Sequence, residues 1–252
     1  MFLGYEPSVS LRHFPNRVVF GMFRSNLIAL FLLTCPFAYA HGSLSVVIDD
    51  FSVGNSGTVP AVFSSKGLYP VFTTTDPSIL GGVRKWQVDV THHSVTDSKI
   101  YDGIADMFGI ANGMGQHSNV AIRWDGQNNQ SMSGNFPTID ISQNGSVDSF
   151  SLEILSADLA TRFEMSVSDI DSSFKLSKAF SGTANTAYRF SEFLGIDFAQ
   201  IKSIQLNISG LSAFDVAMGQ LSTTKTVPEP IGLLIWSTFF GIGLLRLRQR
   251  RL

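Results

Sequence analysis

Hydrophobic and polar residues alternate with a period of two along the central part of the chain. Such alternation is typical of β-strands that bury one face. Each alternating segment has an apolar residue at every second position, as in Trp86, Val88 and Val90. The segments are residues 44–48, 86–90, 120–124, 150–154, 163–167, 204–208 and 214–218. The pattern therefore predicts an all-β body.

Turn-forming residues separate these segments, with Gly, Asn, Asp and Ser clusters at 54–57, 81–82, 125–129 and 143–145. No segment has a convincing helical period. Residues 101–115 are the one stretch where a short helical turn is considered, although their glycines favour a loop. Many short antiparallel strands in about 180 residues predict a single two-sheet sandwich, jelly-roll-like, over residues 41–222. Residues 223–227 are predicted to form a short stalk.

The first forty residues have the pattern of an export signal. Arg24 precedes the uncharged run 27–35, and Ala38 and Ala40 supply the small residues that signal peptidase recognises. We expect cleavage after Ala40. Met22 is an alternative start, because residues 22–40 already form a complete short signal. The lone cysteine, Cys35, lies inside this signal, so the predicted mature body has no disulfide.

The other end of the chain has a short apolar run followed by basic residues. Residues 231–245 carry no charge, and a helix over them would be ~22 Å long, shorter than a ~30 Å hydrocarbon core. Four arginines follow: Arg246, Arg248, Arg250 and Arg251. The positive-inside bias predicts that this end stays cytoplasmic while the body is exported across the inner membrane.

Charge is distributed unevenly along the chain. Residues 41–226 carry 11 Lys and Arg against 18 Asp and Glu, a net charge of −7, whereas the other seven basic residues lie near the two ends. A nucleic-acid-binding domain requires positive charge on its folded surface. The acidic body therefore excludes nucleic acid as the expected partner.

The tripeptide Pro228-Glu229-Pro230, the short apolar run and the terminal arginines occur in that order. Together they resemble the PEP-CTERM sorting signal of Gram-negative bacteria, over about the last 26 residues of the chain. The resemblance implies processing by the membrane enzyme exosortase and delivery to the cell envelope, surface or biofilm matrix. Glu229 between two prolines is a stiff, non-helical stretch that such an enzyme could reach.

The body is also similar to jelly rolls of the galactose-binding and carbohydrate-binding type. The similarity lies in residues 48–51 and 197–206, and in the final strand that contains Asp215. It implies sugar binding, and a structural Ca²⁺ in many members. Asp49, Asp50 and Asp215 would meet as a candidate site for structural Ca²⁺ if the first and last strands are neighbours; the alternative is that they are ordinary turn and strand-end aspartates. Residues 169–173 lack the Gly and distal Glu of a calcium loop and predict a hairpin turn.

No motif of an established catalytic class is present, and we predict a non-enzymatic protein with no catalytic residue and no cofactor beyond the optional Ca²⁺. A copper site at His41 is disfavoured because the adjacent His92 and His93 point to opposite faces of a strand. Trp86 and Trp124 occupy the same alternating positions as the apolar residues of their strands, so we predict that both pack in the core.

The leading interpretation is a structural matrix protein. The alternatives are a carbohydrate-binding adhesin, with exopolysaccharide as partner, and a secreted polysaccharide-active enzyme.

Overall fold

Two antiparallel sheets make up the body, as the alternation predicts. The structure, a computed structural model, describes residues 45–54 and 59–225, which belong to one compact unit. Sheet A has the order β12 (Ala184–Arg189), β9 (Ser149–Ala157), β14 (Asp215–Thr224), β7 (Phe108–Asn112), β6 (Ser98–Asp102) and β2 (Ala61–Phe63), with β1 (Val47–Asp49) beside β14. Sheet B has the order β11 (Ser173–Phe180), β10 (Thr161–Ser168), β13 (Ser203–Gly210), β8 (His117–Trp124), β5 (Val83–His92) and β3 (Gly67–Leu68), with β4 (Phe72–Thr75) beside β5.

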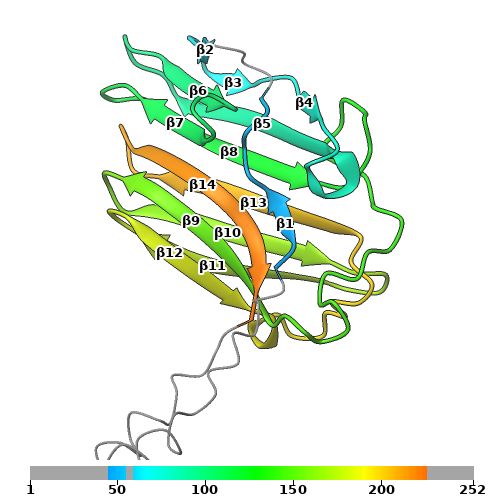
Figure 1. Cartoon of the computed structure of the whole chain (residues 1–252). Helices are drawn as coiled ribbons and strands as arrows, with labels where there is room; N and C mark the ends of the chain where they lie inside the picture. The colour runs from blue at the N-terminus through cyan, green and yellow to red at the C-terminus, as the bar shows by residue number, and fades with distance from the viewer. Residues whose placement is uncertain (1–44, 55–58, 226–252) are drawn as a thin grey trace, which may run out of the picture. The chain divides into compact units, whose positions relative to one another are not determined.

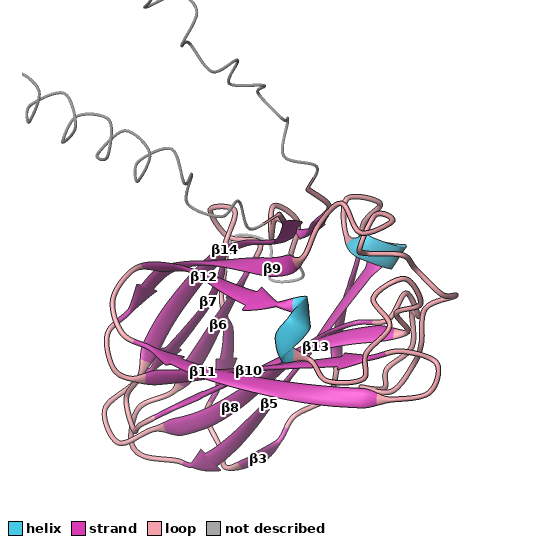
Figure 2. Cartoon of the chain, turned by 90° about the horizontal axis from the view of Figure 1, so that it is seen from below, coloured by secondary structure: helices cyan, strands magenta, loops and turns pink. Residues whose placement is uncertain are grey.

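The two sheets lie face to face as the layers of a sandwich (Figures 1 and 2). Two short 3-10 helices, η1 (Leu80–Gly82) and η2 (Phe190–Glu192), lie in the connections. The chain passes between the sheets many times, so neighbours in a sheet are mostly distant in sequence. The jelly-roll-like sandwich expected from the sequence is confirmed.

The predicted strands bury the side chains that the alternation assigns to the core. On β8, Val120, Ile122 and Trp124 are buried, while Ala121 and Arg123 point to the outer face. The predicted core role of both tryptophans is confirmed, because Trp86 and Trp124 are 0% exposed.

The segment 101–115 forms a hairpin in place of a helical turn. It contains the end of β6 and the whole of β7, which pair in register from Asp102 and Phe108. Gly103, Ala105 and Asp106 have positive φ between these strands. That backbone conformation reverses the chain and is incompatible with a right-handed helix. The helical alternative is therefore wrong.

A buried ionic cluster joins the two sheets through the core. Arg84 on β5 pairs with Asp49 on β1 and with Asp102 on β6, each at 2.5 Å. Trp124 Nε1 donates to Asp49 at 2.7 Å, and Trp86 Nε1 donates to Asp102 at 2.9 Å. Burial raises the pKa of Asp49, while Arg84 and Trp124 act in the opposite direction. These contacts satisfy charges that would otherwise be costly in a core.

Within the described ranges no helix has the length and hydrophobicity that a membrane crossing requires. The predicted signal, with Ala38 and Ala40, lies outside the described residues, as does the whole segment 228–252.

Candidate functional site

The outward side of sheet B carries a continuous polar surface, here called the polar face. It is formed by the outward side chains of β10, β13, β8 and β5, four adjacent strands of the sheet. Antiparallel register places these side chains in rows that cross the strands. One row is Asp89, Asn119, Ser209 and Arg162, and the next is Gln87, Ala121, Asn207 and Glu164. At the usual strand spacing each row is about 15 Å long.

Three side chains of the first row have no polar partner within the protein. No hydrogen bond or ion pair among the described residues engages the side chains of Asp89, Asn119 and Ser209. All three are half-buried. A carboxylate, an amide and a hydroxyl therefore stand side by side, partly open to solvent, with their hydrogen-bonding capacity unused by the protein.

These rows line a hollow of about 310 Å³ in the polar face. Ala121 is one of its lining residues, and its small side chain lies between Gln87 and Asn207 in the second row. Leu68 borders one side and is 67% exposed, and Arg162 borders the other. Seven of its eleven lining residues are thus polar or charged, with an apolar margin at β3.

A chain of hydrogen bonds orients the polar groups of the second row. Arg123 Nη1 donates to Gln205 Oε1 at 3.2 Å, and Gln205 Nε2 donates to Asn207 Oδ1 at 2.8 Å. Asn207 Nδ2 in turn donates to Glu164 Oε1 at 3.3 Å. Each amide has one correct orientation in such a chain, because its oxygen must accept and its nitrogen must donate. Arg123 therefore determines which atoms of Asn207 face the hollow.

Charges in the hollow are nearly balanced. Glu164 lies 3.5 Å from Arg162 Nη2 and 3.4 Å from Lys175 Nζ. Both cations are largely exposed, so each pair contributes little to stability. Asp89 adds one further negative charge at the opposite side. The hollow therefore suits a neutral, hydroxyl-rich ligand better than a strongly charged one.

The expected calcium residues are not assembled into one site. β1 does pair with β14, but Asp49 lies opposite Leu221, six residues and about 20 Å along the strand from Asp215. The carboxylate of Asp49 instead accepts hydrogen bonds from Arg84 and Trp124. No group of three or more His, Cys, Asp or Glu residues with a metal-binding arrangement occurs in the described part of the chain.

The other two aspartates have local structural partners. Asp50 accepts hydrogen bonds from the amide and hydroxyl of Ser52, and these bonds lower its pKa. Asp215 Oδ1 accepts a hydrogen bond from the backbone N–H of Asn112 at 2.9 Å. Burial raises the pKa of Asp215, and the nearby charge of Asp158 acts in the same direction. These contacts are those of turn and strand-end aspartates.

The predicted hairpin at residues 169–173 is confirmed, because Asp169 joins β10 to β11 through a bond from its amide to Ser172 O. His92 lies opposite His117 across β5 and β8. His117 Nε2 is 2.5 Å from Gly210 O and its Nδ1 is 3.0 Å from Thr91 Oγ1. His93 Nδ1 is 3.2 Å from Gln116 Oε1.

The sequence reasoning did not identify the polar face. One signal was present: the outward positions of β8 and β13 are rich in amides, namely Asn119, Gln205 and Asn207. Their proximity to Asp89 depends on the strand order, which the local pattern does not contain.

Pro228, Glu229, Pro230 and the four terminal arginines lie outside the described residues, so the sorting signal stays a prediction.

No model of a known protein family matches the chain, and no curated protein matches its sequence. Solved structures of carbohydrate-binding modules are similar to it at low TM-scores. One is a family 11 module from Clostridium thermocellum in complex with a β-1,3-1,4-mixed-linked tetrasaccharide, with 12% identity over 73% of this chain and 98% of that one, at a TM-score of 0.37. A second is the family 11 module of a cellulosomal cellulase of Clostridium thermocellum, with 10% identity, coverages of 74% and 98%, and a TM-score of 0.37. TmCBM61 in complex with β-1,4-galactotriose has 12% identity, coverages of 62% and 87%, and a TM-score of 0.27.

Proposed function

We propose that the protein binds a polysaccharide through the hollow in the polar face. The observation that carries this proposal is the row Asp89, Asn119 and Ser209, whose side chains have no partner among the described residues. Polar groups that are half-buried and unpaired gain most from a ligand that replaces water with directed hydrogen bonds. A ligand with many hydroxyls can satisfy all three at once.

Sugar hydroxyls match the chemistry of this row. Each hydroxyl is both a donor and an acceptor, so it can bind the carboxylate of Asp89, the amide of Asn119 or the hydroxyl of Ser209. Leu68 and Ala121 offer apolar contacts for the C–H surface of a sugar ring. Because each hydrogen bond contributes only about 0.5–1.5 kcal/mol, a row that contacts several sugar residues is needed for useful affinity.

Other ligand classes fit the hollow less well. A nucleic acid would meet a body with a net charge of −7. Small-molecule and cofactor sites are usually enclosed and mostly apolar, whereas this hollow is open and seven of its eleven lining residues are polar or charged. The charge balance of Arg162, Glu164 and Asp89 favours a neutral chain over a polyanion.

We place this binding in an exported protein. The predicted signal ending at Ala40 and the resemblance of residues 228–252 to a PEP-CTERM tail support delivery to the envelope or the extracellular matrix. Exopolysaccharide is the polymer that such a protein would meet there. The proposed role is therefore non-catalytic attachment to matrix polysaccharide, with signal peptidase and exosortase as processing partners.

A glycan array probed with the full-length chain tests the proposal. We expect binding to neutral oligosaccharides that increases with chain length, because longer chains occupy more of the row. Absence of binding to every neutral glycan would contradict it and leave a purely structural matrix role. Release of reducing ends from a bound polysaccharide would replace the proposed role with an enzymatic one.

A further inference from the structure

The connection between β8 and β9 contains oxygen-bearing side chains at every second residue. They are Asp125, Gln127, Asn129, Ser131 and Ser133, at positions 1, 3, 5, 7 and 9 counted from Asp125. Calcium loops of the EF-hand type place their ligands at these same positions and use the backbone carbonyl at position 7. The loop departs from that pattern at position 6, where Gln130 replaces Gly, and at position 12, where Phe136 replaces Glu.

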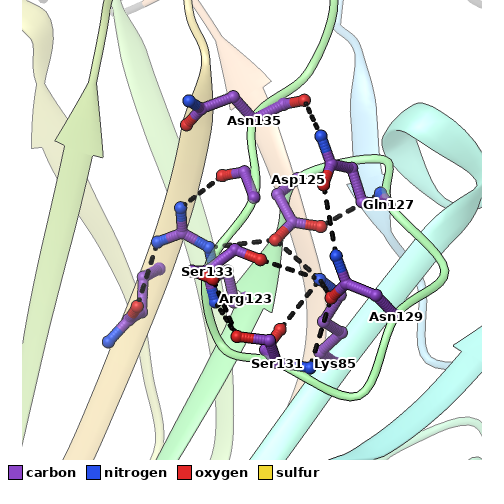
Figure 3. Close-up of polar contacts among 10 residues, drawn as sticks. Lys85, Arg123, Asp125, Gln127, Asn129, Ser131, Ser133 and Asn135 are labelled. Carbon is purple, nitrogen blue, oxygen red and sulfur yellow. Dashed lines mark hydrogen bonds and ion pairs between the residues drawn. The ribbon is translucent and has the colours of Figure 1, made fainter.

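The loop surrounds a cation that the protein itself supplies (Figure 3). Lys85 on β5 points into it and is 0% exposed. Its Nζ donates to Asp125 Oδ2 at 2.9 Å, Asn129 Oδ1 at 2.8 Å and Ser131 O at 2.9 Å. Ser133 O lies at 3.4 Å. The ammonium therefore contacts oxygens from positions 1, 5, 7 and 9.

The close fit of the loop around this ammonium depends on a glycine. Gly134 has φ of 152°, and a side chain there would lie 2.6 Å from Asp125 Oδ2 and 3.0 Å from Gln127 Oε1. Asp125 is itself 0% exposed and accepts a second bond from Arg123 Nε at 3.1 Å. A buried carboxylate and several inward-pointing oxygens are stable only around positive charge.

We propose that residues 125–133 form a cation-binding loop in which the Lys85 ammonium takes the place of a divalent metal ion. The native loop then needs no metal. Removing the ammonium leaves an oxygen-lined cavity that accepts Ca²⁺, with water completing the six to eight oxygens that this ion prefers. Because the loop supplies only one carboxylate, that affinity is in the low range, with a dissociation constant on the order of 1 mM.

The Lys85→Ala variant of the full chain tests this by thermal melting in 10 mM Ca²⁺ and in chelator. We expect the wild type to melt at the same temperature in both. We expect Lys85→Ala to melt lower, and Ca²⁺ to raise its Tm by roughly 3–5 °C at that excess. Lys178→Ala is the matched control, because Lys178 also joins a carbonyl and a carboxylate, those of Ala187 and Glu192. It should lose stability without a response to Ca²⁺.

A Ca²⁺ response in Lys85→Ala no larger than in Lys178→Ala would overturn the proposal, as would a wild type that loses stability in chelator. Asn129→Asp provides a test that retains the lysine. The variant places a second carboxylate at the position of Asn129 Oδ1, which lies 2.8 Å from the Lys85 ammonium. We expect this ion pair to raise the Tm and to leave melting independent of Ca²⁺. A lower Tm for Asn129→Asp would overturn the proposal even if Lys85→Ala does not fold.

Discussion

Arg84 on β5 and Asp49 on β1 form an ion pair of 2.5 Å that connects the two sheets inside the core. The pair is part of a cluster in which Arg84 also binds Asp102, so one guanidinium neutralises two buried carboxylates. Buried ion pairs of this kind contribute little net stability while intact, but they become costly when one partner is removed. The cluster therefore fixes how the sheets are placed, and its loss can be measured.

Arg84→Met is expected to lower the free energy of unfolding by about 3–5 kcal/mol, because Asp49 and Asp102 are left buried without a counter-ion. Denaturant unfolding measures this loss. Arg189→Met, at an exposed arginine, is the control and should change stability by less than about 0.5 kcal/mol. Equal stability of the two variants would show that the cluster has no structural role.

Asp169 is expected to stabilise the fold in a pH-dependent manner. Burial opposes its charge, but the amides of Asp197, Ser172 and Asp171 outweigh burial and lower its pKa. A pKa below the unfolded value of about 3.9 gives stability that is present above pH ~4 and lost as pH falls through the folded value.

Asp169→Asn should therefore cost about 1–3 kcal/mol at pH 7, and the difference from wild type should shrink below pH ~3. Unfolding curves across this range provide the measurement. Asp171→Asn is the matched control, since Asp171 is exposed in the same turn and its replacement should change stability by less than about 0.5 kcal/mol. A pH-independent loss in Asp169→Asn would argue against the charge as the cause.

Gln205→Glu is expected to weaken polysaccharide binding about tenfold, although Gln205 does not line the hollow. The substitution puts an acceptor opposite Asn207 Oδ1, which now accepts from Gln205 at 2.8 Å. Asn207 must then turn and present its oxygen to Glu164. Calorimetric titration measures the effect. Gln130→Glu adds the same charge in the exposed loop and should bind as wild type does.

The full-length chain is expected to be cut near residues 228–230 in a host that contains exosortase. Mass spectrometry of the released protein identifies the new C-terminus. Peptides that end at Leu252 in most of this material would contradict the prediction. Replacing the four terminal arginines, Arg246, Arg248, Arg250 and Arg251, with glutamine should reduce processing, because they are expected to hold the tail on the cytoplasmic side.

The fold was predictable where the alternation is local and uninterrupted. β8 and β10 show it clearly, and both were found. β11 was missed although Phe174, Leu176 and Phe180 alternate toward the core, because Lys178 occupies the same phase. Its ammonium is accommodated by Glu192 and lies 4.9 Å from the centre of the Tyr188 ring. Those partners belong to β12, a strand of the other sheet, and to the connection that follows it, so the sequence around Lys178 does not indicate them.

The candidate site was less predictable than the fold, because it depends on which strands are neighbours. Asp89 and Asn119 are thirty residues apart in sequence yet lie opposite each other on β5 and β8. Asp49 was a candidate calcium ligand, with an ordinary strand-end role as the alternative, since short Asp side chains suit both turns and hard cations. Its actual partner, Arg84, is 35 residues away on the other sheet. Long-range pairing decided the role of both aspartates.

The most direct test of the proposed function is a calorimetric titration of Asn119→Ala with the glycan that the wild type binds best. Removing this amide from the centre of the row should weaken binding about tenfold. The double variant Asp89→Ala, Asn119→Ala should weaken binding by up to about a hundredfold. Asn185→Ala, at an exposed asparagine of sheet A, is the matched control and should leave affinity unchanged. Equal affinity of wild type, Asn119→Ala and the double variant would contradict binding at the polar face.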